Sequence, residues 1–354
     1  MTKDSLLSFV ESVTDGSRLR VETDLGGGFV RLQVSEAQRR QAKQDIRCVE
    51  DAVIELLRNA RDAHAHTIFV ASSKSGSTRT LTMLDDGDGV PLELWDTVFE
   101  PRVTSKLDTI HTDTWGVHGR GMALYSIRQN ARVAEIVQSS VGEGSAFTFA
   151  FDLKDISERA DQSSLPALIM HNDGLHLGSS PHNIVRVVSE FSLENPDACD
   201  VYIGSPIEIA ASVYAYGKRL LHNTHPLHTP SIHHPLVQLS RTSDAQAFML
   251  AAKELGLEMS ARSAHRILQG DVKPLRPLIT TLKRDEASFK KHDIDLTKDF
   301  RGLRIHKDDI ADFQADLKKA FSELADRYYL ESDVEPSVRV THDAIQVSFP
   351  VCRL

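Results

Sequence analysis

The chain has 354 residues, of which 41% are hydrophobic and 26% are charged, and its formal net charge is −9 at pH 7. This length leaves room for two domains, and the composition is that of an ordinary soluble globular protein. The negative charge excludes a protein that is basic overall, as a dedicated nucleic-acid coat would be, although it leaves room for a local basic surface.

The first 155 residues alternate between helical and strand-like patterns, which predicts an α/β sandwich with helices on one face of a mixed sheet. In chain order the segments are a lead-in with a glycine turn (1–45), a helical pattern (34–65), two β-rich segments (67–72 and 78–84), an aspartate- and glycine-rich turn (85–91), a polar loop (102–118), a helix that begins after Gly121, and two strands (133–139 and 145–153).

The character of the chain changes after Asp155. Residues 156–235 combine short β-like runs and a helix with a connector rich in proline and histidine, and residues 236–354 read as mainly helical with a closing strand pair. The sequence therefore predicts three parts, with boundaries at residues 155 and 235.

The amino terminus and the cysteines bear on the compartment. Residues 1–7 lack the charged and apolar regions of a secretion signal, and no apolar run approaches the ~18 residues that a membrane span needs. Cys48, Cys199 and Cys352 are far apart and odd in number, so they fit neither a disulfide framework nor a zinc site. We therefore expect a cytoplasmic protein without a membrane segment, whose cysteines act as small, mostly buried apolar residues.

The helical pattern carries a carboxylate and a carboxamide on one face. Glu55 and Asn59 are four residues apart, so on a helix they lie one turn apart on the same side. The amide oxygen could bind Mg²⁺ together with a nucleotide, and the carboxylate could orient and deprotonate water. Taken alone, such a pair is also common on a solvent-exposed helix face.

Three glycine-containing segments complete the pattern. In residues 85–91 the glycines allow a close approach of the backbone to a ligand, and Asp85 can accept a hydrogen bond from an exocyclic amine. Gly119 and Gly121 precede a helix, whose free N–H groups and positive dipole end could bind an anion. Residues 142–149 are a glycine turn followed by alternating strand residues. Each segment alone has an ordinary interpretation, such as an acidic surface turn or a plain hairpin.

Together, in this order and spacing, the four features resemble the GHKL ATPase superfamily, which includes gyrase, the heat-shock chaperones of ninety kilodaltons, histidine kinases and MutL. The resemblance covers about residues 45–153. It implies a two-layer α/β sandwich that binds ATP with Mg²⁺, followed here by a second, mostly helical carboxy-terminal domain.

The resemblance also implies roles for individual residues. Glu55 resembles the general base that activates water, and Asn59 resembles the Mg²⁺ ligand. Asp85 resembles the carboxylate that recognises the adenine amino group, with Ser145 as a partner through water. The other nucleotide-binding residues that the resemblance implies are Asp62, Gly87, Gly89, Lys106, Gly119, Arg120, Gly121 and Met122.

The resemblance leaves both hydrolysis and phosphotransfer open. Residues 99–101 and 142–147 are similar to histidine kinase segments, whereas residues 104–106 and 119–127 are more similar to MutL. Glu55 favours hydrolysis coupled to a conformational or dimerisation switch, because a carboxylate can act as a base toward water and the asparagine of many histidine kinases cannot. No histidine precedes His64, so kinase activity, the alternative, would need a phosphoacceptor on a separate partner protein.

Residues 251–268 have the spacing of two helices joined by a glycine-containing turn. This is typical of a helix-turn-helix, with Arg262, His265 and Arg266 on the exposed face of the second helix, and it predicts DNA as a partner through residues 245–291. An ordinary helical hairpin with a solvated basic face is the other interpretation.

Five histidines gather in the connector at positions 222, 225, 228, 233 and 234. Imidazoles at this density could bind Zn²⁺ or Ni²⁺, but no cysteine or nearby carboxylate completes a ligand set. We interpret them as loop residues.

Overall fold

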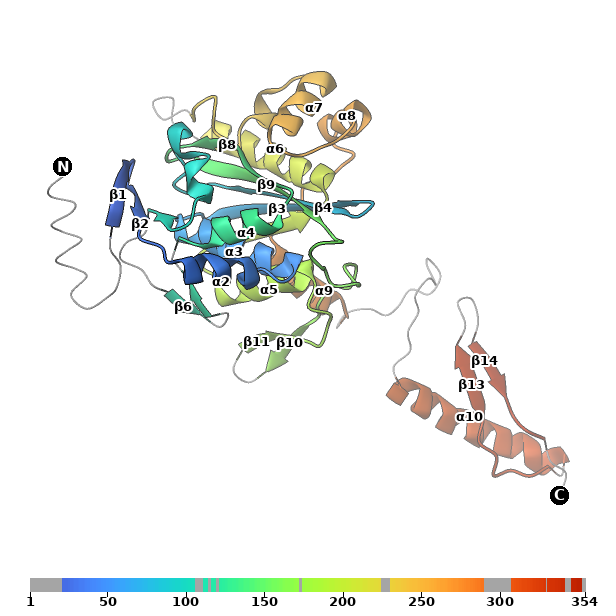
Figure 1. Ribbon diagram of the computed structural model, residues 1–354. Coiled ribbons are helices and arrows are strands. Elements are labelled where there is room, and N and C mark those ends of the chain that lie inside the picture. Colours follow the sequence, from blue (N-terminus) through green and yellow to red (C-terminus); the bar gives the residue numbers. More distant parts are fainter. Residues whose placement is uncertain are drawn as a thin grey trace. The chain divides into compact units, whose positions relative to one another are not determined.

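A computed structural model describes residues 21–105, 111–113, 116–118, 121–171, 174–223, 230–289, 307–328, 330–340 and 345–351. The chain divides into two compact units, Met1–Ala287 and Ser288–Leu354 (Figure 1). Both units combine helices with strands, which confirms the predicted α/β class.

A five-stranded sheet forms the centre of the first unit, in the order β12-β3-β4-β9-β8. Strand β3 (Thr67–Ser75) pairs in parallel with β12 (Asp200–Gly204) and antiparallel with β4 (Thr78–Asp85). Strand β9 (Gly144–Asp152) then pairs antiparallel with both β4 and β8 (Val133–Ser140). The last residue of β4, Asp85, therefore lies opposite Ser145 near the start of β9.

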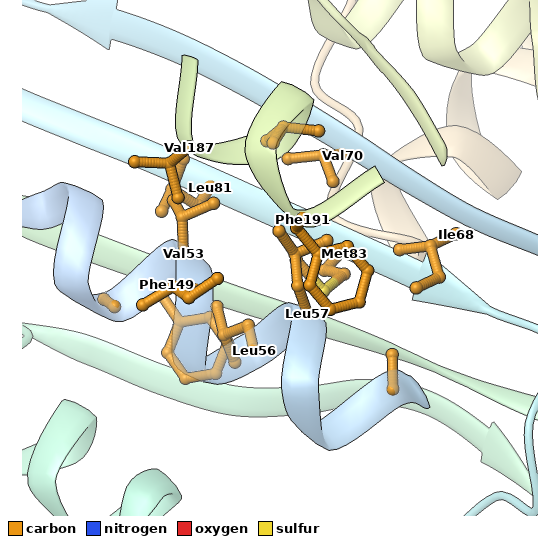
Figure 2. Close-up of a cluster of buried hydrophobic side chains, with 14 of the residues drawn as sticks. Val53, Leu56, Leu57, Ile68, Val70, Leu81, Met83, Phe149, Val187 and Phe191 are labelled. Carbon is orange, nitrogen blue, oxygen red and sulfur yellow. The ribbon is translucent and has the colours of Figure 1, made fainter. Parts of the chain in front are cut away.

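One face of this sheet is covered by α3 (Val49–Asp62), α4 (Ala123–Asn130) and α5 (Ile184–Glu194), with α2 (Glu36–Asp45) packed beside α4 (Figure 1). Apolar residues recur along α3 at steps of three and four, so one stripe of the helix faces the sheet. Figure 2 shows the buried cluster that results, in which Val53, Leu56 and Leu57 of α3 meet Ile68, Val70, Leu81, Met83 and Phe149 of the sheet and Val187 and Phe191 of α5.

The other face is covered by α6 (Pro206–Asn223), α7 (Ala245–Glu254) and α8 (Ala261–Leu268) (Figure 1). Side chains alternate between the two faces of a strand, so Phe69 and Leu84 enter this second cluster while their neighbours enter the first. The rings of Tyr214 on α6 and Phe248 on α7 meet edge to face at 5.5 Å. The sheet is consequently buried on both faces. The sequence pattern predicted helices on one face only and did not indicate this second helical layer.

The division between units falls after Ala287, not at the predicted boundaries of 155 and 235. The reason lies in pairing between distant segments. Strand β12 extends the sheet beside β3, and α7 and α8 pack on the sheet itself. Helix α9 (Leu278–Phe289) also contributes Leu278 and Leu282 to the first cluster.

The turn between α7 and α8 is held against the sheet at Gly256. The Thr82 hydroxyl of β4 donates a hydrogen bond of 2.8 Å to the Gly256 carbonyl oxygen. The φ of Gly256 is +73°, and a Cβ there would lie 2.0 Å from Oγ1 of Thr148 on β9. Only glycine fits this position without displacing the sheet or the turn.

Gly256→Ala should therefore lower the free energy of unfolding by on the order of 2–4 kcal/mol, the sum of left-handed backbone strain and overpacking. Chemical denaturation followed by circular dichroism measures this change. Gly270→Ala is the matched control, because Gly270 also has a positive φ, of +83°, but a Cβ there meets nothing within 4 Å. An equal loss in both variants would mean that backbone strain alone, and not contact with the sheet, makes glycine necessary at position 256.

Smaller elements surround the sheet. Strands β1 (Val21–Gly26), β2 (Phe29–Leu32) and β5 (Val103–Thr104) form a three-stranded sheet, and Gly27 and Gly28 turn the first hairpin with φ values of +60° and +85°. The remaining short elements are η1 (Leu92–Leu94), η2 (Thr97–Phe99), η4 (Leu239–Arg241) and the strand pairs β6 (His111–Asp113) with β7 (Gly116–His118) and β10 (Leu168–His171) with β11 (Gly174–Leu177).

The second unit consists of α10 (Lys307–Tyr328) and the predicted strand pair, β13 (Ser337–Val340) and β14 (Ile345–Ser348). Its buried cluster is small, and the rings of Phe321 and Phe349 stack at 4.3 Å within it. Across both units, none of the helices in the described ranges has the length and apolar character needed to cross a membrane.

Candidate functional site

A cavity of about 700 Å³ lies between α3, the end of β4, the segment that follows it, and the start of α4. The sequence-predicted residues on its wall are Glu55, Asn59, Asp62, Asp85, Gly89, Gly121 and Ser145. These residues come from four separate segments of the chain, and the fold brings them to one cavity.

Helix α3 supplies the first wall. Its apolar stripe faces the sheet, so Glu55 and Asn59 lie on the side of the helix that lines the cavity. Nη1 of Arg58 donates a hydrogen bond of 2.6 Å to Oε1 of Glu55, and the Arg58 side chain is only 4% exposed against 23% for Glu55. The buried guanidinium thus holds one oxygen of the carboxylate in place while the carboxylate remains accessible from the cavity.

Asp62 lies at the carboxyl end of the same helix. Its Oδ1 accepts hydrogen bonds of 3.1 and 2.9 Å from Nε and Nη2 of Arg61. The side chain of Asp62 is 8% exposed, so it contributes to the cavity wall mainly as one half of an ion pair.

The opposite wall is formed where β4 ends and β9 begins. Asp85 is 4% exposed, and its Oδ1 accepts a hydrogen bond of 2.9 Å from the backbone N–H of Gly87. The Ser145 hydroxyl lies 3.1 Å from the hydroxyl of Ser139, which in turn accepts a bond of 2.7 Å from the N–H of Val90. A buried carboxylate and a fixed hydroxyl at one end of the cavity are suited to orienting a heterocyclic base.

Two glycines let the turns at this wall pack closely. A Cβ on Gly89, whose φ is +70°, would lie 2.0 Å from the carbonyl oxygen of Ser140. A Cβ on Gly144, whose φ is +98°, would lie 2.0 Å from the carbonyl oxygen of Asp85. Gly87 does not line the cavity. It packs against the carbonyl oxygen of Ala63, so its role is in the packing of the turn.

Gly121 and the first residues of α4 line the cavity at a third side. Met122 is the N-cap residue of α4, makes no side-chain capping bond, and lies outside the cavity wall. The first N–H groups of this helix therefore have the chemistry of an anion site. Lys106, Gly119 and Arg120, which the sequence also predicted, lie outside the described residues.

The structure adds residues that sequence reasoning missed. Gly27 and Phe29 of the β1–β2 hairpin reach the cavity, because β2 pairs with β5, whose Val103 and Thr104 also line it. No local signal at Gly27 or Phe29 indicates this. Arg58 could have been found, since a cation three residues after a carboxylate shares its helix face.

The turn between β8 and β9 is tied to the connector that follows α6. Burial alone would raise the pKa of the Glu143 carboxyl, but hydrogen bonds from the backbone N–H and hydroxyl of Ser231 and from the Ser140 hydroxyl hold it below its usual range. Burial lowers the pKa of the neighbouring His234, against the attraction of Glu143. At neutral pH the contact between the β8–β9 turn and the connector therefore consists of the ionised Glu143 carboxylate and its hydrogen-bond donors.

The cysteines in the described ranges agree with their predicted role. Burial raises the pKa of the Cys48 thiol to about 12 and that of Cys199 to about 11. Thiols this weakly acidic carry little thiolate at neutral pH and are poor nucleophiles.

No group of three or more His, Cys, Asp or Glu side chains placed to hold a metal ion occurs within the described part of the chain. This holds for the described histidines of the connector, His222, His233 and His234. The donor set near the cavity instead suits a hard cation shared with a ligand, because Mg²⁺ commonly takes one or two protein oxygens and completes its shell with phosphates and water.

Residues 46–176 match the family model described as histidine kinase-, DNA gyrase B-, and HSP90-like ATPase. The matched range runs from the start of α3 to β11 and contains every predicted site residue. This part of the chain is therefore an ATP-binding domain of the GHKL ATPase class, as its motifs indicated.

Relatives of this chain include DNA mismatch repair proteins MutL. The protein of Thermus thermophilus is 45% identical over 86 residues, which is 24% of this chain and 15% of that protein. Those of Thermus aquaticus and Staphylococcus aureus are 42% and 36% identical over 99 and 111 residues, which is 27% and 30% of this chain and 18% and 16% of theirs. The matched region thus spans less than a fifth of each relative.

A solved structure, full-length ShkA in complex with AMPPNP, aligns over 57% of this chain and 46% of that chain at 16% identity. The TM-score is 0.22, and we draw no conclusion from this alignment.

Proposed function

We propose that the first unit binds ATP with Mg²⁺ and hydrolyses the bond to the γ-phosphate, and that this event drives a conformational or dimerisation switch. The observation that carries the proposal is the placement of Glu55 and Asn59 on the wall of the cavity that also contains Asp85 and Ser145. A candidate base for water and a candidate site for adenine then face the same bound nucleotide.

The carboxylate of Glu55 accepts the proton of the attacking water, and Arg58 keeps that carboxylate oriented through its 2.6 Å bond. The amide oxygen of Asn59 is the protein ligand for Mg²⁺, and the ion, when bound, neutralises charge on the phosphates. The N–H groups at the start of α4 receive phosphate oxygens. Asp85 accepts a hydrogen bond from the amino group of adenine, which guanine cannot supply at the same position.

Hydrolysis is favoured over transfer to protein because the residue on α3 is a carboxylate. A carboxylate can remove a proton from water, whereas the asparagine of many histidine kinases cannot. Transfer of the γ-phosphate to a separate partner protein is the alternative, and it uses the same cavity and the same positioning groups.

The relatives are named for DNA mismatch repair, and an ATP-dependent association with a second copy of the chain or with another protein fits such a role. Sedimentation velocity with and without a non-hydrolysable ATP analogue tests this part. An unchanged sedimentation coefficient would count against nucleotide-driven dimerisation.

The deciding experiment follows ATP labelled at the γ-phosphate after mixing with the pure protein and Mg²⁺. We expect the label to appear as inorganic phosphate. Label that remains on the protein, or that moves only to an added partner, would replace hydrolysis by phosphotransfer. A protein that does not bind ATP at all would refute the proposed function.

A further inference from the structure

The helix pair α7–α8 lies on the face of the sheet opposite α3 and outside the matched residues 46–176 (Figure 1). Asp244 and Ser260 cap the two helices through their side chains. The joining residues 255–260 exceed the three or four of a common helix-turn-helix, but they are fixed to the sheet at Gly256. The pair is therefore a rigid, well-defined surface element and not a mobile hairpin.

Helix α8 separates its residues cleanly by face. Ala264 and Ile267 are buried against the sheet side, at 0% and 3% exposure. Arg262, His265 and Arg266 are exposed, as the sequence pattern predicted, and Gln269 continues the same stripe. These four side chains lie at steps of three and four residues, so they project from one side of the helix.

The segment of the chain that carries this stripe is basic, in contrast to the chain as a whole. Residues 245–283 contain six Lys or Arg against three Asp or Glu, whereas the whole chain has a net charge of −9. All six cations are exposed: Lys253, Arg262, Arg266, Lys273, Arg276 and Lys283. A local excess of positive charge on an acidic protein is a feature that an anionic polymer would recognise.

The composition of the surface distinguishes between anionic partners. A protein partner would be expected to bury apolar or aromatic anchors. Within residues 245–283, all of which are described, Leu250 is the only large exposed hydrophobic side chain. Single-stranded nucleic acid is bound by stacking on exposed aromatic rings, but the only aromatic residue in this range, Phe248, is 0% exposed.

Binding of duplex nucleic acid requires neither an exposed apolar side chain nor an exposed aromatic ring. The duplex is held by cations on its phosphates, and arginine and glutamine side chains on a short helix can reach base edges in the major groove of DNA. The major groove of duplex RNA is too deep and narrow for this mode of contact. The stripe on α8 therefore fits duplex DNA better than the other anionic polymers.

We infer that the α8 stripe, together with cations of the segment that follows it, forms a contact surface for duplex DNA on the face of the sheet opposite α3. Arg262 and Arg266 contact the DNA directly, and Lys273 and Arg276 lie on the segment that follows α8. This segment is held in place by the hydrogen bond of 2.8 Å from the Leu275 N–H to the hydroxyl of Ser212 on α6.

The test measures fluorescence anisotropy of a labelled 20-base-pair duplex with the full chain over a range of salt concentrations. The wild type should bind the duplex, and affinity should fall steeply with salt. The double variant Arg262→Gln, Arg266→Gln should bind about tenfold or more weakly and should reduce the slope of log K against log salt by roughly two, because each lost phosphate contact contributes about 0.9. A single strand of the same length should bind at least about tenfold more weakly than the duplex.

Arg39→Gln with Lys43→Gln is the matched control, because these cations are also exposed and four apart on a helix, α2. This variant makes the same change in net charge and should leave duplex affinity within about twofold of wild type. Absence of duplex binding at 50 mM salt would overturn the inference. Equal weakening by the two variants, or equal binding of duplex and single strand, would overturn it as well.

Discussion

Glu55→Gln is expected to lower the rate of phosphate release by about 10²–10⁴-fold, the usual contribution of a general base. Glutamine keeps the size of the side chain and can still accept the hydrogen bond that Arg58 donates, but it cannot take a proton from water. The affinity for ATP should therefore change little. Single-turnover release of labelled phosphate, together with equilibrium binding of ATP, measures the two quantities separately.

Glu36→Gln is a suitable control for this experiment. Glu36 is an exposed glutamate on α2, with 70% of its side chain accessible, and it does not line the cavity. It should release phosphate at the wild-type rate. If Glu55→Gln turned over ATP as fast as this control, another group would have to act as the base.

Asp85→Asn is expected to weaken ATP binding by about 10–100-fold, which corresponds to the loss of one charge-assisted hydrogen bond in a buried site. The Asp85 carboxylate accepts a hydrogen bond from the N–H of Gly87 and is 4% exposed, and in the proposed complex it also accepts one from the adenine amino group. The variant also presents an amide donor in place of an acceptor-only group, so its preference for ATP over GTP should fall. Competition binding with both nucleotides measures the two effects.

Asp96→Asn provides the comparison, because Asp96 is an exposed carboxylate on the same connecting segment and lies outside the cavity wall. Wild-type affinity and selectivity are expected for it. Unchanged nucleotide selectivity in Asp85→Asn would mean that some other group reads the base, and Ser145 would be the next residue to change.

The Arg58–Glu55 pair gives the proposed general base a defined orientation. A buried guanidinium beside the base removes the freedom of the carboxylate to rotate, and it also carries positive charge at the edge of the cavity. The two residues are three apart on one helix, so their contact is local. It can be predicted from the sequence once the helix is assigned.

The sequence by itself determined the main helices and strands of residues 49–152 and the motif set of the ATP-binding domain, but not the strands within the predicted lead-in and polar loop. Both depend on local patterns: apolar residues at helical spacing along α3, the glycine turn before Ser145, and the four-residue step from Glu55 to Asn59. Such patterns are visible because each arises within one helix or one turn, where the backbone alone sets the distance.

Only the tertiary structure decided which distant segments complete the unit. Three contacts join residues that are far apart in the chain: β12 pairs with β3, Gly256 accepts a hydrogen bond from Thr82, and Phe29 lines the cavity. No local pattern encodes them, because β12 and β2 would show the same strand propensity beside any partner. The boundaries predicted at 155 and 235 differ from the observed division for this reason: a break in local composition does not end a sheet that later residues extend.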